Sequence, residues 1–296
     1  MTSRAALLGR LARGPAADYL ALTKPRVVLM VLVTTLVGFY LGTSGGAETA
    51  RLAATLLGTA LAAGGTLALN QVLERDVDGK MARTRRRPLP DGRLQPGAAA
   101  AFGAGLVAGG LALLAAAVNP LSSLVTALTA ASYLFVYTPL KRRSAVCALL
   151  GAIPGALPPV TGWVAARGDL GMQAAVLFGI LFLWQLPHTL AIACVYRKDY
   201  AQAGLCLPPV VDPEGRATGR HAVLDSLALF AVGLLPTLIG MAGRLYLLGA
   251  LVLGAAVLAC AWSLAASRSV QDARRLALAS LIYLPALFAL LALDKG

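Results

Sequence analysis

Long apolar runs recur from one end of the chain to the other, and they constrain its fold more than any other feature. A helix needs about 20 residues to cross the roughly 30 Å of hydrocarbon in a bilayer. Of the 296 residues, 58% are hydrophobic and 13% are charged. In soluble domains about 45–50% of the residues are apolar and about 25% are charged. The sequence therefore predicts an all-α membrane protein with nine transmembrane helices, near residues 25–42, 52–72, 97–117, 120–139, 144–164, 170–195, 222–242, 245–266 and 274–293.

The nine helices are expected to form a single bundle around a central cavity. Glycine recurs in clusters within the apolar runs, for example at Gly103, Gly105, Gly109 and Gly110. Small residues let helix backbones approach closely in lipid, which favours tight packing over loosely tethered spans. We expect one nine-helix domain over residues 25–293, preceded by a cytoplasmic tail over residues 1–24.

The distribution of basic residues predicts the orientation of the bundle. The N-terminal segment and the connections after the second, fourth, sixth and eighth helices hold 22 of the 26 Lys and Arg residues. The positive-inside rule then places the N-terminus and these connections in the cytoplasm and the C-terminus outside. The net charge of +13 is explained by topology and by anionic lipid head groups, so we do not expect nucleic-acid binding. A multi-pass protein of the cytoplasmic (inner) membrane is predicted.

Two connections on the predicted cytoplasmic side are long, at about residues 73–96 and 196–221. Long loops without secondary structure are uncommon unless they are functional. We therefore expect the active-site loops, and the opening of the cavity, on this side of the bundle.

The first of these loops begins with a spaced set of oxygen-bearing side chains, Asn70, Glu74 and Asp78. If the second helix continues to Asp78, a spacing of four residues places all three on one helix face. Carboxylate and amide oxygens suit Mg²⁺, which usually binds one or two carboxylates together with substrate phosphate. Simple neutralisation of the adjacent arginines is the alternative, but acidic groups that begin inside an apolar span are costly and usually functional. The pattern predicts a catalytic metal site.

Basic and acidic residues on the neighbouring cytoplasmic segments are candidates for binding phosphate and metal. Arginine and lysine bind phosphate through charge-assisted hydrogen bonds and stabilise charge on a leaving group. The substrate-binding candidates are Arg83, Arg87, Tyr137, Lys141, Arg197 and Lys198. Asp199 is expected to act as a second acidic contributor to the metal site.

Acids that hold a metal, cations that hold phosphate and an apolar cavity together imply an amphiphilic phosphorylated substrate. A polyprenyl diphosphate has this form, with a hydrocarbon tail and a polyanionic head. Mg²⁺ and basic side chains would stabilise the departing diphosphate and leave an allylic cation in a water-poor site.

Several motifs resemble those of the UbiA-type intramembrane prenyltransferases, and within that superfamily the chain is most similar to the protohaem IX farnesyltransferases. They are Asn70-x-x-x-Glu74-x-x-x-Asp78, Arg83-Thr84, Arg87-Pro88-Leu89, Leu183-Trp184-Gln185-Leu186-Pro187-His188 and Arg197-Lys198-Asp199-Tyr200. Quinone-forming branches normally have Asn-Asp at the start of the first motif and several aspartates in the second, whereas this chain has Gln71 and a single Asp199.

The resemblance implies nine helices, Mg²⁺ as the cofactor, and two acidic motifs that face one cavity. It implies farnesyl transfer from farnesyl diphosphate to a vinyl group of haem B, which is a substrate and not a cofactor, with haem O and diphosphate as products. Membrane lipid surrounds such an enzyme, and a haem A synthase or a terminal oxidase is the expected downstream partner.

His188 is the predicted contact for haem. A histidine near the inner end of an apolar helix is costly to leave unpaired and often marks a functional site. The preceding proline frees a backbone carbonyl and kinks the helix, which would widen a cavity at that point. We expect His188 to contact the haem iron or a propionate.

Two alternative functions are compatible with parts of the sequence. A prenyltransferase that acts on an aromatic quinone precursor would use the same donor chemistry. A transporter would also explain buried acids in a polytopic bundle, but it would place them near the bilayer midplane, often within inverted repeats. The charges gather on one side of this chain, which favours the enzyme.

Overall fold

The computed structural model describes residues 14–43, 45 and 48–296, and this part of the chain is helical almost throughout. Prolines occupy the first turn of many helices, where the missing N–H has no intrahelical partner to lose. The helices are α2 (Pro15–Leu22), α3 (Pro25–Gly42), α4 (Thr49–Asp78), α5 (Pro96–Ala117), α6 (Pro120–Ala131), η1 (Ser132–Tyr137), α7 (Thr138–Leu140), α8 (Cys147–Ala156), α9 (Pro158–Arg167), α10 (Met172–Val195), α11 (Arg197–Gln202), α12 (Pro208–Val211), α13 (Arg216–Gly233), α14 (Leu235–Leu238), α15 (Arg244–Ser267) and α16 (Val270–Leu293).

Nine spans within these described residues are long and apolar enough to cross a membrane, which confirms the predicted fold class. One span is continuous through α6, η1 and α7, and another joins α8 to α9. At the basic end the helices run past the apolar spans. Helix α4 continues to Asp78, as the spacing argument for Asn70, Glu74 and Asp78 requires, and α13 begins at Arg216, before the apolar run at about residue 222. Polar residues in these terminal turns keep them out of a hydropathy pattern.

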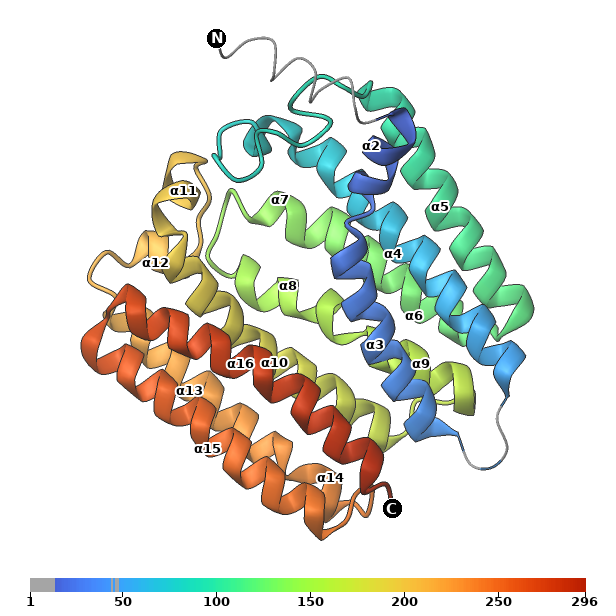
Figure 1. Cartoon of the computed structure of the whole chain (residues 1–296), viewed down its shortest axis with the longest axis vertical. Coiled ribbons are helices and arrows are strands. Elements are labelled where there is room, and N and C mark those ends of the chain that lie inside the picture. The colour runs from blue at the N-terminus through green and yellow to red at the C-terminus, as the bar shows by residue number, and fades with distance from the viewer. Residues whose placement is uncertain (1–13, 44, 46–47) are drawn as a thin grey trace.

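The spans lie side by side in one bundle (Figure 1). Helix α10 packs against α8, α13 and α16, while α3 packs against α4 and α9, and α4 against α5. The connection after α4 lies at the same end of the bundle as α2, α7, α11 and α12, and α14 and the C-terminus lie at the other (Figure 1). We call the end that carries α2, α7, α11 and α12 the basic end.

Glycines set the close contact between α4 and α5. A Cβ at Gly65 would lie 2.5 Å from the Gly103 carbonyl oxygen, and one at Gly110 would lie 2.5 Å from the Gly58 carbonyl oxygen. Gly105 and Gly109 face open space. Only part of the predicted cluster therefore serves helix packing, because the other two glycines point away from α4.

Candidate active site

Asn70, Glu74 and Asp78 lie on the last turns of α4, as their spacing predicts. Asn70 and Asp78 are fully buried and the Glu74 side chain is nearly so. Two carboxylates in such a place need partners, because an unpaired buried charge is strongly unfavourable.

Each carboxylate has a cation as its partner. The Lys141 ammonium donates to both oxygens of Glu74, at 2.9 and 3.2 Å. The Arg87 guanidinium donates to Asp78 at 2.6 Å. The Thr84 hydroxyl donates to the Asp78 carbonyl oxygen at 2.7 Å, which fastens the loop that carries Arg87 onto the end of α4. Two predicted phosphate contacts, Lys141 and Arg87, therefore neutralise two of the predicted metal ligands, Glu74 and Asp78.

The amide of Asn70 has a fixed orientation. Its nitrogen donates to the Thr138 hydroxyl at 3.1 Å, and that hydroxyl donates to the Tyr133 carbonyl oxygen at 2.8 Å. Because the Thr138 proton is already used, Asn70 must present its nitrogen there and keep its oxygen for another partner.

The same contacts involve a π-helical turn, η1, in which the Thr138 N–H also bonds to the Tyr133 carbonyl oxygen. Such turns are rare and are often found at functional sites. The rings of Tyr133 and Tyr137 lie 5.3 Å apart, and both line a cavity inside the bundle.

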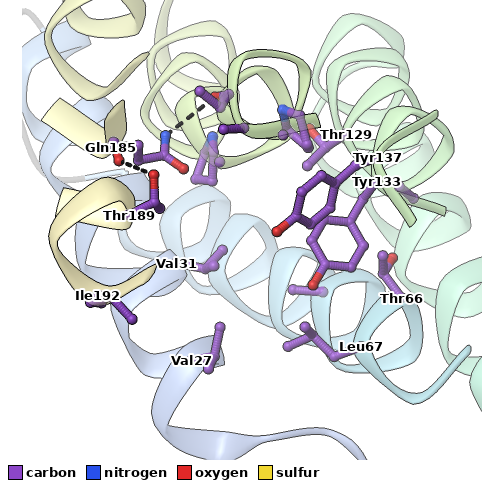
Figure 2. A pocket seen from close by; sticks show the side chains of 18 of the residues that line it. Val27, Val31, Thr66, Leu67, Thr129, Tyr133, Tyr137, Gln185, Thr189 and Ile192 are labelled. Atoms are coloured by element: carbon purple, nitrogen blue, oxygen red, sulfur yellow. Dashed lines mark hydrogen bonds between the residues drawn. The ribbon is translucent and has the colours of Figure 1, made fainter. Parts of the chain in front are cut away.

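The cavity has a volume of about 370 Å³ and is bounded by α3, α4, α6, η1, α8, α9 and α10. Figure 2 shows Gln185 and Thr189 of α10 on one side of the cavity, Tyr133 and Tyr137 on the opposite side, and Val27 and Val31 of α3 below them. Tyr200 and Leu207, from the segment after α10, complete the wall at the basic end. Most of the lining is apolar, which suits a hydrocarbon chain.

Lys141 connects this cavity to the carboxylates. Its ammonium lies 4.3 Å from the centre of the Tyr137 ring. Burial alone would lower the pKa of Lys141, but Tyr137, Tyr133 and the Glu74 carboxylate outweigh it and hold the pKa above its ordinary value. Lys141 therefore stays charged, directly between the ion pairs and the apolar interior.

Lys24 is a further cation of the site that the sequence analysis missed. It has left-handed backbone angles, with φ at 48°, and the Gln71 amide donates to the preceding Leu22 carbonyl oxygen at 2.7 Å. Burial, followed by the positive charges of Arg87 and Lys141, lowers the pKa of Lys24 from 10.5 to about 8. Its position directly before the first span was the available signal.

The remaining candidates of the two loops are placed differently. Arg83 stacks over the Tyr196 ring at 5.6 Å, which brings the two loops together. Arg197 donates to the Pro213 carbonyl oxygen at 3.2 Å and lies in a separate hollow. Lys198 and Asp199 form no side-chain ion pair within the described residues.

No group of three or more His, Cys, Asp and Glu side chains among residues 14–43, 45 and 48–296 could hold a metal ion on its own. A metal here would depend on the oxygens of α4 together with oxygens from a substrate, which is the usual arrangement for Mg²⁺.

His188 lies beside the cavity wall and contacts α16. Its Nδ1 lies 2.8 Å from the Ser280 hydroxyl, and its ring stacks on Trp184 with centroids 4.7 Å apart. Gln185 and Thr189 of the same helix line the cavity, whereas His188 does not. The structure thus places the predicted haem contact next to the cavity, with its side chain directed to a neighbouring helix.

The sequence model of the UbiA prenyltransferase family matches residues 31–288. The chain belongs to this family. A relative named protoheme IX farnesyltransferase from Solibacter usitatus is 47% identical over an alignment of 287 residues, which covers 94% of this chain and 98% of the relative. A relative of the same name from Koribacter versatilis is 42% identical, over 94% of this chain and 93% of its own length.

Several solved structures share the fold of this chain. A digeranylgeranylglyceryl phosphate synthase aligns with a TM-score of 0.80 at 14% identity and covers 94% of this chain and 97% of its own. A UbiA homologue from Archaeoglobus fulgidus, bound to GPP and Mg²⁺, aligns with a TM-score of 0.66 at 20% identity. The alignment covers 93% of this chain and 99% of the homologue. The bundle is thus the family fold, and the chain is a multi-pass membrane protein.

Proposed function

We propose that this chain transfers the farnesyl group of farnesyl diphosphate to a vinyl carbon of haem B, and that it releases haem O and diphosphate. The observation that carries the proposal is the pair of buried, cation-neutralised carboxylates, Glu74 and Asp78, beside an apolar cavity. The names of relatives that align over nearly their whole length support the farnesyl donor and the haem acceptor.

The donor's head group belongs at the carboxylates. Asn70, Glu74 and Asp78 offer hard oxygen ligands that fit Mg²⁺, and Mg²⁺ bound there would neutralise charge on the diphosphate as it leaves. Asp199 stays a proposed second contributor, because Ala203, directly after α11, shares a hydrophobic cluster with Val77 and Met81 at the end of α4.

The cations would exchange partners when the donor binds. Lys141 and Arg87 would donate to diphosphate oxygens, which would leave the Glu74 and Asp78 carboxylates free to hold Mg²⁺. Lys24, whose pKa responds to the charges of Arg87 and Lys141, would add a third positive charge. Preorganised donors of this kind stabilise the charge that develops on a leaving group. Arg83, Arg197 and Lys198 are proposed as weaker, more exposed contacts.

The hydrocarbon chain belongs in the cavity. The C1–O bond of the donor breaks and its electron pair leaves with the diphosphate, beside Tyr137 and Lys141. The rings of Tyr133 and Tyr137 then face the allylic cation, which an aromatic face attracts. The vinyl carbon of haem attacks C1, and water finally captures the new cation to form the hydroxyl group.

His188 is retained as a proposed contact on the acceptor side, reached from the flank of α10. A prenyltransferase that acts on an aromatic quinone precursor is the alternative, because the donor site alone does not select the acceptor. The transporter hypothesis explains neither the paired charges at one end of the bundle nor the family membership.

The purified chain in lipid nanodiscs, supplied with farnesyl diphosphate, Mg²⁺ and haem B, tests the proposal. We expect a more hydrophobic haem, separated by chromatography and identified by mass, that is absent when Mg²⁺ is chelated. Prenylation of 4-hydroxybenzoate but not of haem would favour the alternative.

We further propose that the basic end faces the cytoplasm of a bacterial inner membrane, with the C-terminus outside. Reporters fused after residues 92 and 215 should read cytoplasmic, and one fused after residue 296 should read external. The opposite pattern would reverse the orientation of the site.

A further inference from the structure

Gln185 carries the only amide side chain among the described residues of α8 and α10 that line the cavity, where the hydroxyl of Thr189 is the other polar group. Its nitrogen donates to two carbonyl oxygens, those of Ala152 at 3.2 Å and Leu181 at 3.1 Å. Because carbonyl oxygens can only accept, the amide nitrogen of Gln185 must face Ala152 and Leu181, and the amide oxygen must point away from them.

The oxygen of Gln185 has no hydrogen-bond donor among the residues that the structure describes. It lies over Gly155, where a Cβ would come within 1.9 Å of it. Figure 2 shows this oxygen turned into the cavity, on the side of Tyr137. An acceptor in an apolar wall is costly unless a bound group donates to it.

Gln185 lies close to the part of the cavity where Tyr137 is held. A Cβ at Gly151 would come within 2.5 Å of the Tyr137 ring, and Gly151 lies one turn before Gly155 on α8. The ring and the amide therefore rest on adjacent turns of one helix. Tyr137 in turn contacts Lys141 at the donor site.

We propose that the Gln185 oxygen positions the water that ends the reaction, and that it thereby determines which product forms. This inference rests on the proposed function. After the vinyl carbon bonds to C1, the cation lies on the carbon next to the porphyrin ring. A water that donates one hydrogen to Gln185 directs a lone pair at that carbon.

The step balances without a further reagent. The water oxygen forms a C–O bond with the cationic carbon, and its second proton passes to the released diphosphate, a base that the reaction itself supplies. If no water is held there, the cation instead loses a proton from the neighbouring carbon. The product is then an alkene, lighter than haem O by one water.

Product analysis of Gln185→Leu tests the inference, because leucine fills similar space without an acceptor. We expect the ratio of hydroxylated to alkene product, measured by mass spectrometry of extracted haem, to fall by roughly 5- to 150-fold. The KM for farnesyl diphosphate should stay near that of the wild type, because leucine keeps the volume of the cavity wall and the head-group residues Glu74 and Asp78 are unchanged.

Two further variants separate positioning from packing. Gly155→Ala keeps the amide but must displace its oxygen, so the same shift in product ratio is expected. Thr189→Val is the matched control, since Thr189 lines the cavity but its hydroxyl donates to the Gln185 backbone carbonyl at 2.7 Å. Its ratio should not change.

The outcomes distinguish this inference from the proposed function. If the wild type makes no farnesylated haem, the proposed function fails. If it makes hydroxylated haem and both the Gln185 and Gly155 variants keep the wild-type product ratio, the role of Gln185 is overturned. A lower total yield at an unchanged ratio would equally show that the amide serves only packing.

Discussion

Removing Lys141 should destabilise the bundle by far more than removing a typical surface lysine. The Lys141 and Glu74 side chains are 15% and 13% exposed, and their charged atoms lie 2.9 Å apart. At an effective dielectric constant of about 20, this separation gives an attraction of about 6 kcal/mol. Desolvation offsets part of it, but loss of one partner of a buried pair costs about 3–5 kcal/mol.

A double-mutant cycle isolates this energy. Lys141→Met leaves the Glu74 carboxylate buried without its partner, so we expect the thermal unfolding midpoint in detergent, without Mg²⁺ or substrate, to fall by roughly 5–15 °C. Adding Glu74→Gln removes the stranded charge and should recover most of the loss. Neither variant should turn over, because both lose groups of the donor site.

Arg51→Met is the matched control for this cycle. Arg51 pairs with Glu48 at 2.6 Å, but both side chains are more than two-fifths exposed. Its removal should cost about 1 kcal/mol or less. A coupling energy between Lys141 and Glu74 as small as that of a surface pair would refute the reasoning that the site is dry and electrostatically coupled.

Three further predictions follow from the site. Asp78→Asn should abolish turnover in the haem assay and leave membrane insertion intact, whereas Asp76→Asn, at an exposed carboxylate, should remain active. The kcat/KM for farnesyl diphosphate should fall as the pH rises through about 8, since Lys24 loses its charge there; an unchanged alkaline limb in Lys24→Arg would contradict this. Ser280→Ala and His188→Ala should both lower the unfolding temperature, but only His188→Ala should raise the KM for haem if the histidine contacts it, and equal KM changes in the two variants would assign it to packing.

The spans and the acidic face of α4 could be predicted because they depend on local patterns. Hydropathy over about 20 residues identifies a span, and a spacing of four residues identifies a helix face. Asn70, Glu74 and Asp78 were therefore recognisable as a group without any knowledge of tertiary contacts.

The partners of these acids could not be predicted, because they depend on how distant segments meet. Lys141 lies 67 residues from Glu74 in the sequence. The ion pair of Arg87 with Asp78 depends on the conformation of the loop between them, which the hydrogen bond from the Thr84 hydroxyl to the Asp78 carbonyl oxygen stabilises. Both cations were expected to bind phosphate, and nothing in the pattern indicated that they pair with the acids. The sequence pattern also could not predict which face of α10 lines the cavity, and therefore could not predict that His188 lies beside it and contacts Ser280.

The π-helical turn η1 lets this span hold one residue more than a regular helix of the same length. A π turn closes through an i→i+5 bond and completes about one rotation, as the α-helical turn that it replaces does. Deleting one residue from Ser132–Tyr137 would therefore be absorbed by relaxation to an α-helical turn, and Lys141 would still face Glu74. Deleting one residue from α6, with η1 kept, would instead rotate everything after it by about 100° and turn Lys141 away from Glu74. Only the second deletion would yield a protein that inserts into the membrane and has lost its donor site.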